Sequence, residues 1–232
     1  MKLRIKFSKQ GVIRYIGHLD LMRYFQKTIR RAGIDVSYSG GFSPHQIMSF
    51  AAPLGVGLTS NGEYMDIQVD SFTDCEDVKT RINAVSIPEI QVLSVKILPD
   101  NAENAMASVA AAEYTISFKE NKAPSLDFAS CIEKLMQREE ILFIKEGKKG
   151  TREVNLRPGI YRFEYKDSKF RLLVDASSGG NIKPVQVMNA LLAETGKELE
   201  ANSLHIVREE VYTSVETEEG NKLIPLEELG HE

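Results

Sequence analysis

The sequence predicts an α+β protein made of two ferredoxin-like units in tandem, each with an antiparallel sheet and helices on one face. Three observations indicate this fold. The 232 residues are 42% hydrophobic, which is enough for one large core or two small ones. Strand and helix patterns follow the order β-α-β-β-α-β twice. Small and polar residues at 99–112 separate the two series and indicate a linker or a short helix.

The first series occupies residues 1–98. "KLRIKF" alternates, with Leu3, Ile5 and Phe7 on one face, as in a half-buried strand. Apolar residues at helical spacing then predict a helix that begins at His18 and ends at Gly33. The remaining expected elements are strands at 35–39, 47–57 and 63–69, a turn at 57–62, a helix at 75–85 capped by Asp74, and a strand at 89–98.

The second series occupies residues 112–215 and includes an extra hairpin with basic residues. Pro184 suits the first turn of its second helix, and a tight turn is expected at Asp167–Lys169. The expected elements are strands at 113–119, 141–146 and 203–215, further strands within 148–176, and helices at 125–139 and 183–195. Residues 216–232 are predicted to form an acidic tail.

The charge is distributed unevenly along the chain. The formal net charge is −4, yet residues 1–50 carry nine Lys/Arg against two acids, a net +7. Residues 209–232 carry eight Glu against Lys222 alone, a net −7. This asymmetry indicates a basic face and an acidic tail, and the alternative is two ordinary solvated surfaces.

Several classes of protein are not expected from this sequence. It has no run of 18 apolar residues and no apolar segment near its N-terminus, so we expect a cytoplasmic protein without a membrane span. Cys75 and Cys131 belong to no CxxC pattern, and we expect free thiols and no metal or cofactor on this chain. HExxH, Walker A and GxSxG patterns are absent.

The helix after the first strand is the first candidate site. Arg23, Lys27 and Arg30 recur at helical spacing and form one stripe, which Arg14 and Arg31 can flank. Such a stripe can neutralise successive phosphates of a nucleic acid. A solvated helix face is the alternative.

Two further segments are candidates for phosphate binding. In "SGGFSPH", Gly40 and Gly41 permit a close backbone approach, and Ser43 and His45 supply polar groups. In "KEGKKGTREVNLRP", the basic residues Lys148, Lys149 and Arg152 indicate a basic hairpin. An ordinary strand-connecting loop and an ordinary exposed hairpin are the respective alternatives.

Two histidines are the candidates for catalysis. His18 lies two residues before Asp20, and His45 follows the glycine-rich loop, so either can be considered as a general acid or base. A capping or packing role for His18 and a surface position for His45 are the alternatives. The residues alone therefore assign no catalytic group.

Residues 7–67 closely resemble the bacterial radical SAM-associated (radical SAM-linked) proteins, a family defined around a domain of unknown function. The motifs that carry the resemblance are "GHLDLMR", "RRAG", "GFSPH", "PLGVG" and "GEY", and "REVNLRP" in the second half also fits. The resemblance implies a partner radical SAM protein that carries an iron–sulfur cluster and S-adenosylmethionine, with cobalamin as an open further cofactor. It also implies that the gene lies near the gene of an RNase E/G-type ribonuclease. The resemblance supplies no catalytic residue.

These features lead to three hypotheses. The first is an accessory protein that binds tRNA or rRNA and works with a radical SAM enzyme in RNA modification or processing. The second is a metal-independent endoribonuclease or RNA-modifying enzyme that uses His18 or His45. The third is a protein-interaction partner without RNA contact. The sequence leaves the RNA substrate, the reaction and the oligomeric state open.

Overall fold

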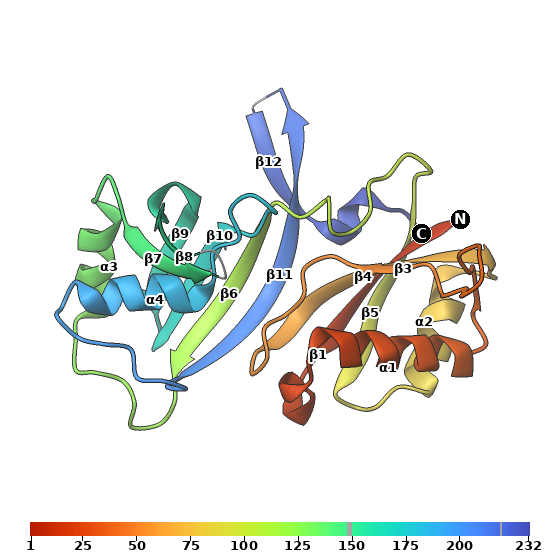
Figure 1. Ribbon diagram of the computed structural model, residues 1–232, viewed down its shortest axis with the longest axis horizontal. Helices are drawn as coiled ribbons and strands as arrows, with labels where there is room; N and C mark the ends of the chain where they lie inside the picture. Colours follow the sequence, from red (N-terminus) through yellow and green to blue (C-terminus); the bar gives the residue numbers. More distant parts are fainter. Residues whose placement is uncertain (148–149, 219) are drawn as a thin grey trace. The chain divides into compact units, whose positions relative to one another are not determined.

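The computed structural model describes residues 1–147, 150–218 and 220–232 and divides into two compact units. Unit 1 consists of Met1–Ala110 with Arg208–Glu232, and unit 2 of Ala111–Val207. The described residues form four α-helices and mostly antiparallel strands, which confirms the α+β class (Figure 1). None of these helices has the length and hydropathy needed to cross a membrane.

Unit 1 follows the order β-α-β-β-α-β, with the second strand divided into two short pieces. Its elements up to residue 98 are β1 (Lys2–Lys9), η1 (Gly11–Tyr15), α1 (His18–Arg31), β2 (Asp35–Val36), β3 (Met48–Phe50), β4 (Thr59–Ser71), α2 (Cys75–Ala84) and β5 (Ile90–Leu98). β1 pairs antiparallel with β4 on one side and with β5 on the other. β2 and β3 pair antiparallel with the second half of β4.

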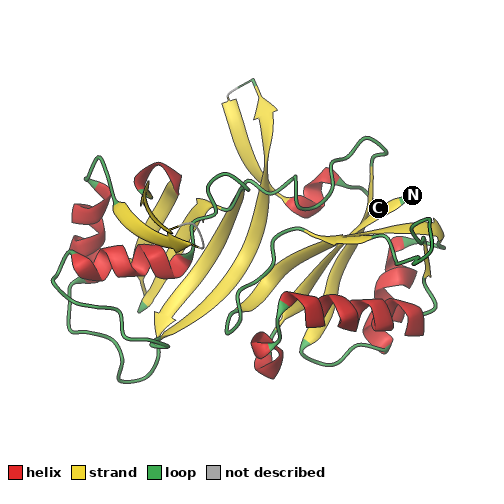
Figure 2. Cartoon of the chain, viewed as in Figure 1, coloured by secondary structure: helices red, strands yellow, loops and turns green. Residues whose placement is uncertain are grey.

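The predicted core face of β1 is confirmed. Leu3, Ile5 and Phe7 are fully buried and pack with α1 and α2, which lie on one face of the sheet (Figure 2). Phe7 meets Phe25 of α1 edge to face, with 4.6 Å between ring centroids. Leu21, Phe25 and Ile29 are spaced four residues apart, so α1 presents one apolar stripe to the sheet.

The prediction that β1 is only half-buried is wrong, because its second face is covered as well. Arg4 is 0% exposed, and its guanidinium makes two hydrogen bonds to the Asp66 carboxylate, at 2.8 and 2.9 Å. Lys2 Nζ donates to the carbonyl oxygen of Ala102. A buried charge is tolerated where it is paired and hydrogen-bonded, and the sequence pattern of β1 does not reveal those partners.

The acidic residues at the C-terminal end are folded in unit 1, whereas the sequence predicted a tail. The segment comprises the end of β11 (Leu204–Thr217), β12 (Gly220–Pro225) and η3 (Leu226–Leu229), and its described glutamates lie in β11 and η3 and at positions 218 and 232. Lys6 Nζ lies 2.6 Å from both the Glu210 and the Glu227 carboxylates. Lys96 pairs with Glu232 at 2.8 Å. These carboxylates are held because they neutralise cations of β1 and β5.

The segment between β3 and β4 differs from the prediction of a long strand and a turn at 57–62. β3 covers only three residues, and the chain then turns at Gly55–Leu58, where Gly57 has φ +91°. Gly62 lies inside β4, where the backbone of the neighbouring strand β11 approaches it closely. A Cβ at Gly62 would lie 2.7 Å from the carbonyl oxygen of Glu209, so only glycine allows this approach.

Unit 2 has a second antiparallel set of strands around an aromatic core. Its elements are β6 (Ala111–Phe118), α3 (Phe128–Met136), β7 (Leu142–Gly147), β8 (Gly150–Asn155), η2 (Arg157–Gly159), β9 (Ile160–Lys166), β10 (Lys169–Asp175), α4 (Pro184–Ala193) and the beginning of β11. β10 pairs with β6 and β9, and β7 pairs with β8 as a separate hairpin. Asp167 and Ser168 have φ of 51° and 59°, which confirms the predicted tight turn.

Candidate nucleic-acid interface

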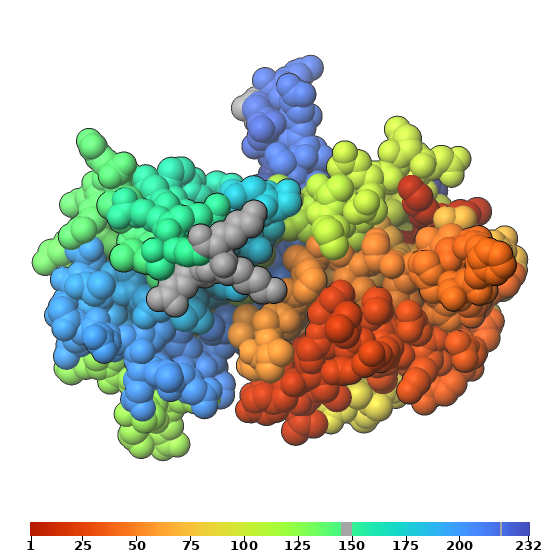
Figure 3. Space-filling view, in the orientation of Figure 1, coloured from red at the N-terminus to blue at the C-terminus, as the bar shows by residue number. Residues whose placement is uncertain are grey.

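The outer face of α1 presents the predicted cations. Arg23, Lys27 and Arg30 are exposed along one side of the helix, whose opposite side is in the core. The N-terminal segment that contains this helix forms the red part of the surface in Figure 3. The Arg23 guanidinium lies 3.2 Å from the Asp20 carboxylate, and both side chains are about two-thirds exposed, at 66% and 63%. Solvent screens such a pair strongly, so Arg23 stays available to a phosphate.

Arg31 and Arg14 flank this stripe in different ways. Arg31 Nη2 donates to the Thr28 hydroxyl at 3.3 Å, and its side chain is exposed. Arg14 lies in η1, before the helix, and its guanidinium stacks over the Tyr15 ring at 4.9 Å from the centroid. The Arg14 carbonyl accepts a 2.7 Å hydrogen bond from the amide of Gly57. The "PLGVG" segment is therefore held beside the beginning of α1.

The glycine-rich segment forms a closed loop. The Ser39 amide donates to the His45 carbonyl at 2.8 Å, and the His45 amide donates to the Ser39 hydroxyl at 3.1 Å. The same hydroxyl lies 2.8 Å from His45 Nδ1. Gly40, Gly41 and Ser43 are exposed within the loop, and Gly41 has φ +98°. The imidazole of His45 thus closes the loop.

A buried glutamine attaches this loop to the basic helix. Gln46 is 4% exposed and follows His45, and its Nε2 donates to the Gln26 carbonyl of α1 at 3.2 Å. The same amide group lies 3.4 Å from the Tyr38 hydroxyl. Gln26 lies next to Lys27 and one turn before Arg30. The loop and the cationic stripe, separate candidates in the sequence, therefore belong to one surface of unit 1.

The basic hairpin of unit 2 is only partly covered by the structure. Arg152 is exposed on β8, and its backbone is paired with that of Lys145 in β7. Lys148 and Lys149, also predicted to bind phosphate, lie outside the described residues. The hairpin is thus a second candidate for phosphate binding, and it belongs to unit 2.

The two histidines have separate surroundings. The His18 ring is half-buried and packs edge to face on Phe50, with 5.2 Å between centroids. Phe50 belongs to the core with Phe7 and Phe25. His45 instead pairs with Ser39 in the exposed loop. The packing role considered for His18 fits this contact, and the geometry does not assemble a general acid and base from the two side chains.

Sequence reasoning missed a buried ionic cluster on the helix-facing side of β1 and β4. Arg208 and Glu63 are 3% and 4% exposed and form a bidentate pair, with one N–O distance of 2.8 Å. Arg208 also donates to the Ala52 carbonyl. Lys9 is 1% exposed, and its ammonium donates to the Ile16 carbonyl at 3.2 Å. Burial lowers the pKa of Lys9, while the negative charge of Glu63 opposes that shift.

This cluster supports the segments that precede and follow α1. Its hydrogen bonds reach the carbonyl groups of Ala52 and Ile16, just before "PLGVG" and "GHLDLMR" respectively. The glutamate of "GEY" is Glu63 itself. The available sequence signal was Glu63, a charged residue at one end of a strand pattern. Its partner Arg208 lies 145 positions away, so the pair could not be predicted from the sequence.

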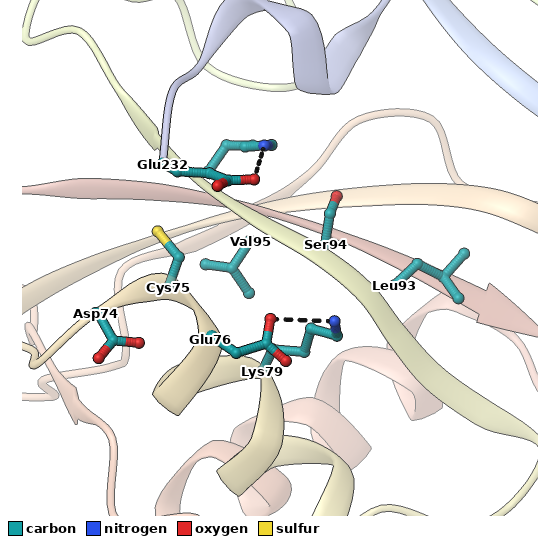
Figure 4. A pocket seen from close by; sticks show the side chains of 9 residues that line it. Asp74, Cys75, Glu76, Lys79, Leu93, Ser94, Val95 and Glu232 are labelled. Atoms are coloured by element: carbon teal, nitrogen blue, oxygen red, sulfur yellow. Dashed lines mark hydrogen bonds and ion pairs between the residues drawn. The ribbon is translucent and has the colours of Figure 1, made fainter.

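A pocket of about 290 Å³ lies beside the beginning of α2 (Figure 4). It is lined by Asp74, Cys75, Lys79, Ser94 and Lys96, among others. Burial raises the pKa of the Cys75 thiol, which disfavours its thiolate form. Within the described residues, no group of three or more His, Cys, Asp or Glu side chains is arranged to hold a metal ion.

Two solved structures show distant similarity to the chain. One is a crystal structure of a Cbf5-Nop10-Gar1 complex, with a TM-score of 0.46 and 9% identity, in which the match covers 90% of this chain and 48% of the other. The second is the archaeal box H/ACA sRNP Nop10-Cbf5 complex, with a TM-score of 0.42 and 9% identity, covering 89% and 46%. This chain thus spans about half the length of the chains that it matches. A likeness at this level carries no function to this protein.

Comparison with curated proteins and with protein families gives contrasting results. No curated protein matches the chain. The model of the family described as "Uncharacterized protein conserved in bacteria (DUF2344)" matches residues 2–184. This range includes α1, the closed loop, and Lys9 and Glu63 of the buried cluster. The chain therefore belongs to this bacterial family, which has a domain of unknown function.

Proposed function

We propose that this protein is a cytoplasmic accessory protein that binds RNA through α1 and the loop at 38–46. The observation that carries the proposal is the hydrogen bond from Gln46 to the Gln26 carbonyl, because it joins the loop to the cationic face of the helix. The RNA would be tRNA or rRNA, presented for modification or processing to a radical SAM enzyme. That partner, its iron–sulfur cluster, S-adenosylmethionine and any cobalamin rest on the family resemblance alone.

The charge distribution in unit 1 supports this surface. Arg4 and Lys6 of β1 are directed to carboxylates of the same unit, whereas Arg23, Lys27 and Arg30 are exposed on α1. Neutralising phosphates with such side chains releases counterions, which makes the affinity fall as salt rises. Binding at this face is therefore expected to depend strongly on salt.

Charge reversal of α1 tests the proposal. The triple variant Arg23→Glu, Lys27→Glu and Arg30→Glu is expected to lose most RNA affinity in low salt. The slope of log K against log salt should fall in magnitude by about 2, since each single-strand phosphate contact contributes about 0.7. A matched control makes the same change in charge on exposed strands of unit 2: Lys166→Glu, Lys169→Glu and Arg171→Glu. Equal affinity in the wild type and the α1 variant would rule the proposal out.

An RNA-cleaving or RNA-modifying enzyme is the first alternative, with His18 or His45 as the catalytic group. The separate surroundings of the two histidines give this alternative less support than RNA binding. Incubation of the protein with labelled RNA, and of the variants His18→Ala and His45→Ala, separates the two. Cleavage that is lost in either variant would favour the enzyme.

A protein-interaction partner is the second alternative, and exposed apolar side chains favour it. Val12, Tyr15 and Leu19 are 60–70% exposed around the beginning of α1, and Val56 is 61% exposed in the neighbouring loop. Such a group can contact the partner radical SAM protein. Capture of that enzyme from nuclease-treated lysate, lost in Leu19→Glu, would show a contact that needs no RNA.

For the fold, we further propose the finer arrangement of two ferredoxin-like units in tandem. The supporting observation is the β-α-β-β-α-β order of unit 1, together with the pairing of β6, β10 and β9 in unit 2. An experimental structure of the full chain tests this assignment. A different strand order in either unit would reject it.

A further inference from the structure

Phe42 lies at the tip of the closed loop and is completely exposed, at 110% of the reference area. The loop around it is tied at its base by the hydrogen bonds between Ser39 and His45. A Cβ placed at Gly40 or Gly41 would meet no atom within 4 Å, so the space beside the tip is open. The phenyl ring therefore contributes nothing to the core, and burying it against a ligand would be favourable.

The surroundings of Phe42 combine aromatic and cationic groups. Tyr38, at the base of the loop, is 49% exposed, and its hydroxyl accepts the 3.4 Å contact from Gln46. That contact leaves the hydroxyl hydrogen of Tyr38 for another acceptor. Lys27 and Arg30 are exposed on the helix beside the carbonyl that anchors the loop. Proteins that bind single-stranded nucleic acid combine aromatic stacking surfaces with a positive path for the backbone.

We propose that Phe42 stacks on an unpaired base of RNA while the cations of α1 hold the adjacent phosphates. This inference rests on the proposed function and specifies its substrate class: single-stranded loops, bulges or ends. In an A-form duplex the faces of the bases are occupied by their neighbours, and side chains cannot read the deep, narrow major groove. A ring at the tip of a loop can reach only a base that is free of its partner.

The neighbouring cations distinguish this ligand from a protein. An exposed phenylalanine alone can also enter an apolar pocket of a partner protein. Stacking with a base requires in addition a positive group within reach of the phosphate that follows the base. The attachment of the loop to α1 through Gln46 supplies that group from the same unit.

The test measures the affinity of the full chain for labelled RNA by fluorescence anisotropy. The probes are a single-stranded oligouridine and a blunt-ended duplex of two separate complementary strands of the same length, which has no unpaired loop. The variants are Phe42→Ala, Phe42→Leu and Phe42→Trp, with Met106→Ala as the matched control at an exposed apolar position outside α1 and the loop. Because the Phe42 side chain is fully exposed, these substitutions are not expected to alter the far-UV circular dichroism.

Phe42→Ala should bind the single strand roughly 5- to 150-fold more weakly, the range expected for one base–aromatic stack. Its affinity for the duplex and its salt slope should stay unchanged, since no charge is removed. Phe42→Trp should retain affinity, Phe42→Leu should lose part of it, and Met106→Ala should bind as the wild type does.

The outcomes separate this inference from the function on which it rests. If the wild type binds RNA with the expected salt dependence and Phe42→Ala binds equally well, the stacking role is wrong and the proposed function stands. If the wild type binds neither probe at low salt, both are wrong. An equal loss on single strand and duplex, or a loss of partner-protein capture without a change in RNA affinity, also overturns the stacking role.

Discussion

Removing the partner of Arg4 should be one of the most damaging single changes in unit 1. The Arg4 side chain is 0% exposed and that of Asp66 is 8% exposed, and two charge-assisted hydrogen bonds join them. Arg4 also donates to the Leu226 carbonyl at 3.2 Å. In Asp66→Ala the guanidinium keeps only carbonyl acceptors, so its buried charge is uncompensated.

The expected loss follows from this burial. Breaking a buried ion pair by removing one partner costs about 3–5 kcal/mol, whereas replacing both partners with apolar residues is often nearly neutral. We therefore expect Asp66→Ala to destabilise unit 1 by about 3–5 kcal/mol, and Arg4→Met with Asp66→Leu to recover most of that loss. The control is Asp20→Ala, which breaks the exposed pair with Arg23 and should cost about 0.5 kcal/mol or less.

Two measurements check this prediction. Urea unfolding is followed by far-UV circular dichroism, because the chain contains no tryptophan. Hydrogen exchange of the amides of β1, which is paired with β4 and β5 in the core, reports on unit 1 separately. If Asp66→Ala costs no more than Asp20→Ala, burial of the Arg4 charge does not control the stability of this unit.

Two further predictions concern the contacts of the C-terminal segment with β4 and β1. Gly62→Ala should destabilise unit 1 by about 1–3 kcal/mol in urea unfolding, because its Cβ would meet the Glu209 carbonyl at 2.7 Å, and an unchanged midpoint would contradict this. Burial would raise the pKa of Glu227, but hydrogen bonds from Lys6 and Ser94 outweigh it and hold the pKa below its usual 4.5. A depressed folded pKa gives stability that is present above pH 4.5 and lost as the pH falls through the folded pKa, so Glu227→Gln should flatten the acid limb of stability against pH.

The elements that the sequence predicted well are those whose evidence is local. The helical spacing of Leu19, Met22, Phe25, Ile29 and Ala32 predicted a helix with one apolar face, and the structure confirms the helix. Leu19 is wrongly placed in that face, because it is 60% exposed and Leu21 is buried instead. The alternation of β1 likewise identified its core face. The covering of the other face of β1 could not be predicted, because Glu210 and Glu227 lie 204 and 221 positions from Lys6. A charged residue in a strand predicts a solvent-exposed side chain unless its partner is known.

The candidate site was predictable in its parts and not in its assembly. The cations of α1 follow from helical spacing, and the glycines indicated an exposed loop. The connection between them depends on the Gln46 side chain and a main-chain carbonyl of Gln26, which any residue would supply. No residue pattern marks such an acceptor. The complete exposure of Phe42 could not be predicted either, because a phenylalanine beside Pro44 and His45 is equally compatible with a packed position in the core.

The net charge of −4 does not argue against RNA binding, because unit 1 divides its cations between two roles. Those on β1 are paired inside the unit: Arg4 with Asp66, and Lys6 with acidic residues of the C-terminal segment. Those on α1 point outward. At physiological salt, charges act over about 8 Å, so carboxylates beyond that distance do little to a phosphate on α1. RNA affinity should therefore follow the local charge of α1 and respond to charge reversal there far more than to equal changes elsewhere.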